Sequence, residues 1–209
     1  MTTVLIVITG TAVAGLLWAE SQVSPWRRVA KVAASTGFIA VALSVGAAGA
    51  GYGRFVLAAL ALSWLGDLCL TYPSPRAFRA GLVAFLLAHG AYIAAFSVRG
   101  IDQVAAMVAL AAVMLVALGA WRWLRPHLGA SMRRPVFAYI IVISLMVTAA
   151  FGTVAADPDW RIAVGAVAFF VSDLLVARDR FVVPGFVNRT IGLPLYYLGQ
   201  TLLALSAGT

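Results

Sequence analysis

The chain has 209 residues, of which 63% are hydrophobic (AVILMFWYC) and 11% are charged, and its mean hydropathy is +1.00. A soluble domain has roughly half apolar and a quarter charged residues, so this composition excludes a water-soluble globule. The formal net charge is +8. The basic residues lie mostly in short stretches between apolar runs, which is typical of membrane topology signals rather than of nucleic-acid binding. The single cysteine, Cys69, excludes an intramolecular disulfide, and we expect it to be a small core residue.

Eight apolar runs are long enough to cross a bilayer, because a span needs about 20 mostly apolar residues. They lie at 3–19, 29–48, 54–71, 80–97, 103–123, 135–155, 160–177 and 190–207. The first run lacks a basic segment before it and is followed by further spans, so we expect a retained helix rather than a signal peptide. None of the runs alternates as the strands of an outer-membrane barrel do. The sequence therefore predicts an all-α, polytopic membrane protein, with residues 1–209 forming one bundle of about eight transmembrane helices.

Basic residues are concentrated in alternate loops and in the adjoining ends of the apolar runs. Twelve of the fifteen belong to the first, third, fifth and seventh loops: Arg27, Arg28, Lys31, Arg76, Arg79, Arg122, Arg125, Arg133, Arg134, Arg178, Arg180 and Arg189. Only Arg54, Arg99 and Arg161 belong to the other loops. Because cytoplasmic loops are enriched in Lys and Arg, we predict that both termini face the extracytoplasmic side.

A weak internal repeat relates the two halves of the chain at a shift of 106 residues, adjusted slightly near the end. The matching pairs are Arg27 with Arg133, Arg28 with Arg134, Asp67 with Asp173, Gly81 with Gly192, and His89 with Gln200. Duplication of four helices, an even number, would give parallel halves related by an axis along the membrane normal. The matches are few and chance could supply them. They suggest a four-plus-four helix repeat in which the helices of Asp67 and Asp173 face each other.

Two acidic residues, Asp67 and Asp173, lie inside apolar runs. The other five fall in or beside loops: Glu20, Asp102, Asp157, Asp159 and Asp179. A carboxylate in a span costs on the order of 3 kcal/mol, so such residues usually face a cavity or a partner and mark function. The alternative is that each pairs with a nearby basic residue or caps a helix. Helical spacing places Trp64 beside Asp67 and Phe169 beside Asp173. Aromatic surroundings favour a neutral carboxyl group and a nearby cation favours a charged one, so the pair can supply one acid and one base.

Further polar residues occur at a similar depth in the predicted spans. They are Lys31, His89, Tyr92, Tyr139, Asn188, Tyr196, Tyr197 and Gln200. None is a strong signal alone: His89 is as readily a packed histidine as a functional one, and Lys31 could extend to the interface. Amphipathic packing is the commoner explanation for Tyr196 and Tyr197.

Several chemistries lack their sequence motifs. The chain contains no Gly-x-Ser-x-Gly elbow, no Walker A loop and no Gly-x-Gly-x-x-Gly motif between a strand and a helix. A catalytic zinc usually has three protein ligands, often histidines, whereas the only histidines are His89 and His127, the latter in a loop. We therefore expect neither a metal nor a cofactor.

Short motifs follow one another in a fixed order along nearly the whole chain. They are Lys31; Gly66-Asp67 and Leu70; Phe78, Gly81, Phe85, His89 and Tyr92; Tyr139; Gly165-Ala166, Phe169, Ser172-Asp173 and Phe181; and Tyr196-Tyr197 with Gln200. This order resembles the YhhN/TMEM86 family of integral membrane proteins. One departure is that the family often has Lys-Pro where Lys31 is followed by Val32.

The resemblance implies an activity, because the characterised animal members of this family are lysoplasmalogenases. Such a hydrolase cleaves the vinyl ether bond of lysoplasmalogen, giving a fatty aldehyde and glycerophospho-ethanolamine or glycerophospho-choline. Protonation of the alkene carbon gives an oxocarbenium ion that water captures, much as in glycosidases. We predict that one of Asp67 and Asp173 is the general acid and that the other, ionised, stabilises the cation and orients water.

The remaining polar residues complete the predicted site. The predicted catalytic residues are Asp67, Asp173 and His89, and the predicted substrate-binding residues are Lys31, Tyr92, Tyr139, Asn188, Tyr196, Tyr197 and Gln200. Among them, Lys31 and Asn188 suit the polar head group, and the alkenyl chain would lie among apolar helix faces. The expected partners are a lysophospholipid or ether-lipid substrate and the surrounding membrane lipids. The Ala-, Gly- and Arg-rich composition and short loops are typical of a bacterial protein of the cytoplasmic (inner) membrane, whose substrate could also be scavenged host lipid or another ether or lyso-lipid.

Two other functional classes stay open at this point. A proton-coupled transporter or channel also uses paired intramembrane carboxylates, and it would favour helices broken near the midplane. Only Gly192 and Pro194 form a close pair of helix breakers within a span. A noncatalytic lipid-binding or scaffold protein would keep its function when both aspartates are replaced by asparagine.

Overall fold

The computed structural model describes residues 1–49 and 51–208, and within them the chain forms eight α-helices and two short helical turns. The α-helices are α1 (Thr2–Ser21), α2 (Arg27–Ser44), α3 (Gly51–Leu70), α4 (Pro75–Arg99), α5 (Gln103–Leu124), α6 (Ala130–Ala156), α7 (Trp160–Ala177) and α8 (Phe186–Ser206). The turns are the 3₁₀ turn η1 (Arg125–His127) and the π-helical turn η2 (Arg178–Val182). Each predicted apolar run coincides with one α-helix, so the predicted all-α bundle is confirmed.

Six helices of the described chain are long and apolar enough to cross a membrane: α1, α3, α4, α5 with η1, α6, and α7 with η2. Helices α2 and α8 are less apolar, because α2 begins with Arg27, Arg28 and Lys31 and α8 carries Asn188 and Gln200. Both nevertheless pack within the bundle, where several of these polar side chains face the interior. The chain is thus an integral, multi-pass membrane protein. Cys69, expected in the core, is only half-buried.

Side chains in the loops fix where several helices begin. Ser74, followed by Pro75 at the first helical position, accepts a hydrogen bond from the Ala77 N–H at the start of α4. Asp102 caps α5 in the same way, and Asp159 caps α7. Helix capping therefore accounts for two of the loop carboxylates but for neither Asp67 nor Asp173, each of which lies near the end of its helix.

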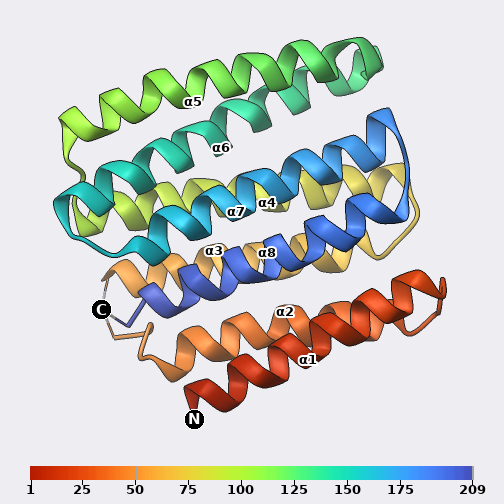
Figure 1. The fold of residues 1–209 in the computed structure, drawn as a ribbon, viewed down its shortest axis with the longest axis horizontal. Coiled ribbons are helices and arrows are strands. Elements are labelled where there is room, and N and C mark those ends of the chain that lie inside the picture. The colour runs from red at the N-terminus through yellow and green to blue at the C-terminus, as the bar shows by residue number, and fades with distance from the viewer. Residues whose placement is uncertain (50, 209) are drawn as a thin grey trace.

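The two halves of the chain share their main helix contacts, although α1 also packs on α8 and the described residues show no comparable packing of α5 on α4. In each half the first helix packs on the second and the third on the fourth, and across the halves α2 packs on α8 as α6 packs on α4. Figure 1 shows the hairpins α1–α2 and α5–α6 on opposite sides, with α3, α4, α7 and α8 between them. The start of α1 and the end of α8 lie at the same end of the bundle, opposite the basic-rich loops (Figure 1). Which end faces the cytoplasm stays a prediction.

Two glycines show how closely the halves correspond. A Cβ on Gly81 of α4 would lie 3.3 Å from the Gly66 carbonyl oxygen, and one on Gly192 of α8 would lie 3.9 Å from the Ser172 carbonyl oxygen. Gly66 and Ser172 immediately precede the two intramembrane aspartates. The close approach of α4 to α3, and of α8 to α7, therefore occurs at equivalent points, as the four-plus-four repeat predicts.

Aromatic rings fill the centre of the bundle, where the two halves meet. The ring of Phe169 lies 6.2 Å from Phe85 and 5.4 Å from Tyr196, both at the steep angles that aromatic pairs prefer. The Phe85 ring also packs against Gly66, where an added Cβ would come within 2.6 Å of it. This packing holds Tyr196 and the helix turn before Asp67 in place.

Candidate active site

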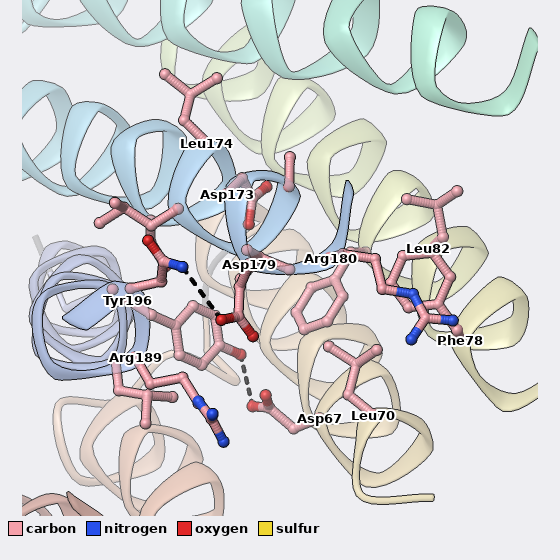
Figure 2. A pocket seen from close by; sticks show the side chains of 18 of the residues that line it. Asp67, Leu70, Phe78, Leu82, Asp173, Leu174, Asp179, Arg180, Arg189 and Tyr196 are labelled. Carbon is pink, nitrogen blue, oxygen red and sulfur yellow. Dashed lines mark hydrogen bonds between the residues drawn. The ribbon is translucent and has the colours of Figure 1, made fainter. Parts of the chain in front are cut away.

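A cavity of about 360 Å³ lies at the end of the bundle that carries most of the basic residues. Six of the predicted site residues line it: Lys31, Asp67, Tyr139, Asp173, Asn188 and Tyr196. Figure 2 shows Asp67 and Asp173 on the walls of this cavity, one from α3 and the other from α7. The fold thus brings together two carboxyl groups that are four helices apart in sequence.

Asp67 is nearly inaccessible, at 2% exposure, and is surrounded by hydrogen-bond donors. Its Oδ1 lies 3.2 Å from Lys31 Nζ, and its Oδ2 accepts hydrogen bonds of 2.6 Å from Ser35 Oγ and from the Tyr196 hydroxyl. A buried charge is stable only when it is paired and hydrogen-bonded, and Asp67 meets both conditions as a carboxylate. Asp67 therefore pairs with a nearby basic side chain, Lys31, and does not cap a helix.

The surroundings of Asp67 differ from the aromatic ones expected from spacing. Trp64 turns toward α2, where its Nε1 donates a hydrogen bond to Thr36 Oγ1. Tyr197, one of the four tyrosines expected to bind substrate, lies 3.1 Å from Ser35 Oγ and donates to the Lys31 carbonyl oxygen at 3.3 Å. Tyr197 therefore positions the Lys31 turn of α2. Sequence reasoning missed Ser35, although it lies four residues after Lys31 and so on the same helix face.

Asp173 is more accessible, with a side chain that is 17% exposed, and has fewer partners. Its Oδ2 accepts a hydrogen bond of 2.6 Å from the Tyr139 hydroxyl. Within the described chain, no Lys or Arg lies within ion-pair distance of it, and its Oδ1 has no hydrogen-bond partner. Phe170 lines the same wall of the cavity. The aromatic setting expected from sequence is therefore found around Asp173.

His89 is fully buried behind Asp173. Its Nδ1 lies 2.6 Å from the Phe85 carbonyl oxygen, which only accepts, so Nδ1 carries a hydrogen. Its Nε2 lies 3.6 Å from Asp173 Oδ2 and has no hydrogen-bond partner in the described residues. The ring is held at this angle by Phe169, with centroids 4.6 Å apart. A neutral imidazole in this position directs the Nε2 lone pair toward the carboxyl group.

Tyr92 and Gln200, predicted to bind substrate, lie beneath the cavity rather than on its wall. Both are fully buried, and the Tyr92 hydroxyl donates a hydrogen bond of 2.6 Å to Gln200 Oε1. Each lies one turn further into the bundle than a residue of the site, Tyr92 after His89 and Gln200 after Tyr196. Their hydrogen bond links α4 to α8 at that depth, so the pair supports the site from below.

Asn188 lines the cavity, but its amide is held by neighbouring groups. Its Oδ1 accepts a hydrogen bond from Arg178, and its Nδ2 donates to Asp179 Oδ1 at 3.2 Å and to the Val183 carbonyl oxygen at 2.8 Å. These bonds fix the connection between η2 and α8. Three arginines that sequence reasoning did not assign also line the cavity: Arg27, Arg180 and Arg189. Their only sequence signal is membership of the basic loops.

The fold and the site define a class: a polytopic α-helical membrane protein with two intramembrane aspartates, in contrasting settings, on one cavity. The chain belongs to the YhhN family, whose profile matches residues 26–207. The predicted family is therefore confirmed.

Curated relatives carry the name lysoplasmalogenase. The chain is 37% identical to the lysoplasmalogenase of Mycobacterium tuberculosis over 152 residues, which is 69% of this chain and 55% of that protein. It is 32% identical to lysoplasmalogenase TMEM86B of Rattus norvegicus over 161 residues (77% and 64% of the two chains), and 29% identical to that of Sus scrofa over 196 residues (93% and 81%). The matched region thus spans just over half the length of the mycobacterial relative. No solved structure matches the chain.

Proposed function

We propose that this protein is a membrane-embedded hydrolase that cleaves the vinyl ether bond of lysoplasmalogen. The products are a fatty aldehyde and glycerophospho-ethanolamine or glycerophospho-choline, and the reaction needs neither metal nor cofactor. The observation that carries the proposal is the contrast between two carboxyl groups on one cavity. Asp67 has a cation and two hydroxyl donors, whereas Asp173 has one hydroxyl donor and faces an imidazole nitrogen. The names of the relatives support the same reaction.

Asp173 is the general acid in this mechanism. Its Oδ2 is oriented by Tyr139, while Oδ1, which has no partner among the described residues, presents the proton to the substrate. Neutral His89 presents the Nε2 lone pair to Oδ2 and not a positive charge, so it supplies no cation that would pair with the ionised form of the acid. Transfer of the proton to the alkene carbon breaks the double bond and leaves the positive charge on the carbon bonded to oxygen.

Asp67 is the ionised partner. Lys31, Ser35 and Tyr196 hold it as a carboxylate, which stabilises the oxocarbenium ion and orients the water that attacks it. The water adds to the carbon bonded to oxygen, and its proton returns to Asp173. The resulting hemiacetal collapses to the aldehyde and the free glycerol hydroxyl, so the overall reaction consumes one water and restores both carboxyl groups.

The other predicted residues act by position. Tyr139 orients the acid, Tyr196 and Tyr197 hold the Asp67 side of the site, and the Tyr92–Gln200 pair supports it from below. Lys31 and Asn188 line the polar end of the cavity, next to the head group. The apolar wall accepts the alkenyl chain and is formed by Leu82, Phe85, Val136, Ile140, Ile143, Phe170 and Leu174. We place the protein in a bacterial cytoplasmic membrane, with the cavity toward the cytoplasm.

The test is release of fatty aldehyde from lysoplasmenyl-ethanolamine by the purified protein in detergent, with and without a chelator. Wild type is compared with Asp67→Asn and Asp173→Asn. The matched control is Asp157→Asn, an aspartate at the opposite end of the bundle whose side chain is 54% exposed. We expect chelator-insensitive release that both cavity variants lose and the control keeps. A folded wild type that releases no aldehyde contradicts the proposal.

A proton-coupled transporter is the second candidate, and the four-plus-four helix repeat is the observation that favours it. Alternating access would need a route from the other end of the bundle. Between the cavity and that end lie the fully buried side chains of Tyr92 and Phe96, and α8 stays one continuous helix through Gly192 and Pro194. Proton-coupled flux in proteoliposomes without product release would favour transport over hydrolysis.

A further inference from the structure

The polar end of the cavity holds more positive charge than its own carboxylates neutralise. Arg27 from the start of α2, Arg180 from η2 and Arg189 from α8 all line it, together with Glu20 and Asp179. Arg189 Nη1 pairs with Glu20 Oε2 at 2.8 Å. Within the described chain, neither Arg27 nor Arg180 has a carboxylate within ion-pair distance. Two arginines at the cavity are therefore available to an anion.

The carboxylate nearest in sequence to Arg180 is already occupied. Asp179 Oδ1 accepts a hydrogen bond of 2.8 Å from the Gly185 N–H and one of 3.2 Å from Asn188 Nδ2. Both bonds fold the chain between η2 and α8. Figure 2 shows Arg180 extending away from Asp179, over the ring of Phe78.

Arg180 is held in place by aromatic stacking. Its guanidinium carbon lies 4.5 Å from the centre of the Phe78 ring, and Phe78 in turn packs edge-on against Phe181, with centroids 5.8 Å apart. Stacking on a ring leaves the N–H groups at the edge of the guanidinium free to donate. The residue comes from a π-helical turn, a distortion that is frequent at functional sites. An oriented, unpaired guanidinium of this kind suits a phosphate group, which it binds with two parallel hydrogen bonds.

We propose that Arg180, together with Arg27, forms a phosphate-binding subsite for the phosphodiester of a lysophospholipid head group. The inference rests on the proposed function, and it specifies how the substrate is oriented in the cavity. With the phosphate at the arginines and the hydrocarbon chain on the apolar wall, the ether bond between them lies at the level of the two aspartates, which line the same cavity. Lys31, by contrast, already forms an ion pair with the Asp67 carboxylate.

The test compares two substrates that share an alkenyl chain: lysoplasmenyl-ethanolamine, which has the phosphate, and 1-alkenylglycerol, which lacks it. Arg180→Gln should raise KM for the phospholipid about tenfold, as loss of one charge-assisted contact predicts, with kcat nearly unchanged. KM for 1-alkenylglycerol should not move. Arg27→Gln should act in the same direction. The matched control is Arg28→Gln, because Arg28 also stacks on a ring, Tyr72, at 5.4 Å but does not line the cavity.

Binding is measured in parallel with a saturated 1-alkyl lysophosphatidylethanolamine, which has no vinyl ether to cleave, and with 1-alkylglycerol. A tenfold weaker binding of the phospholipid alone in Arg180→Gln supports the subsite even where no aldehyde is released, so the subsite is tested separately from the reaction. Equal binding by wild type and Arg180→Gln overturns the proposal. An equal loss for both lipids also overturns it, because Arg180 would then only shape the cavity.

Discussion

The two aspartates occupy equivalent positions in the two halves of the bundle, yet their surroundings differ. Each carboxyl group is met by the fourth helix of the opposite half: Tyr196 of α8 donates to Asp67, and His89 of α4 faces Asp173. The cation beside Asp67 has no counterpart, because the residue 106 positions after Lys31 is Phe137. The two halves of the repeat thus hold unlike carboxyl groups. Asp67 is surrounded by a cation and hydrogen-bond donors, and Asp173 is surrounded mainly by aromatic rings.

The difference shows how a symmetric fold can perform chemistry that needs two unlike groups. General acid catalysis requires a proton donor and a stabilising anion on one substrate, and two identical carboxyl groups would compete for the same state. Here the two carboxyl groups differ because the residues that surround them on the neighbouring helices α2, α4 and α6 differ between the two halves.

The largest effect is expected from Asp173→Asn, which removes the acid but keeps a side chain that can accept the Tyr139 hydrogen bond. Loss of a general acid slows a reaction by about 10²–10⁴-fold, so aldehyde release should fall by that factor. Thermal unfolding in detergent should stay close to that of wild type. A variant that keeps a tenth or more of the wild-type rate would remove Asp173 from the chemistry.

Lys31→Met should have the largest effect on stability. Lys31 is the only lysine in the chain, and its loss leaves the buried Asp67 carboxylate without a cation. Breaking one partner of a buried pair costs about 3–5 kcal/mol, which would appear as a lower unfolding temperature. The double variant Lys31→Met with Asp67→Asn should recover much of that stability but no activity, because both charges are then gone. If the double variant is no more stable than the single one, the pair is not the source of the cost.

Removing the tyrosine hydroxyl beside each carboxyl group should affect kcat to different degrees. Tyr139→Phe removes the hydroxyl that orients Asp173, and we expect kcat to fall about tenfold with little change in KM. Tyr196→Phe removes one of three donors to Asp67, and the two others, from Lys31 and Ser35, remain. Its effect on kcat should be smaller. Steady-state kinetics of both variants, with Tyr72→Phe as an exposed control, test this order.

Sequence alone predicts the helices and the two aspartates well, because hydropathy along one chain reports both directly. It does not report which helices become neighbours. The pairing of Asp67 with Lys31 and Ser35 depends on α2 packing against α3, and the approach of His89 to Asp173 depends on contacts between the halves. Sequence alone also does not report how deep each side chain lies within the bundle.

Depth explains why residues of similar type have different places. Tyr196 reaches the cavity, whereas Gln200, one turn further along α8, is sealed beneath it. Arg180 looks like its neighbours in the basic loops, and it is distinguished by stacking on Phe78 while also lining the cavity. Motif order located the site, and three-dimensional packing decided which members touch the cavity.

The smallest effect concerns Asp159, a buried carboxylate at the opposite end of the bundle, which serves as a structural contrast to the pair. Burial acts to raise the pKa of Asp159, but hydrogen bonds and charge from Arg161, aided by Arg99, outweigh it and hold the pKa below its usual value. A depressed folded-state pKa gives stability that is present above the unfolded pKa of about 3.9 and is lost as pH falls through the folded value.

Wild type should therefore be more stable than Asp159→Asn by the full difference above about pH 3.9, and the difference should shrink as pH falls below that value. Unfolding temperature in detergent, measured from pH 7 downward, gives this comparison. Aldehyde release at pH 7 should be nearly the same for both proteins, because Asp159 caps α7 and does not line the cavity with the two aspartates. A large loss of activity in Asp159→Asn without loss of stability would show that the two ends of the bundle are coupled, and that the contrast between Asp67 and Asp173 is not set by their immediate neighbours alone.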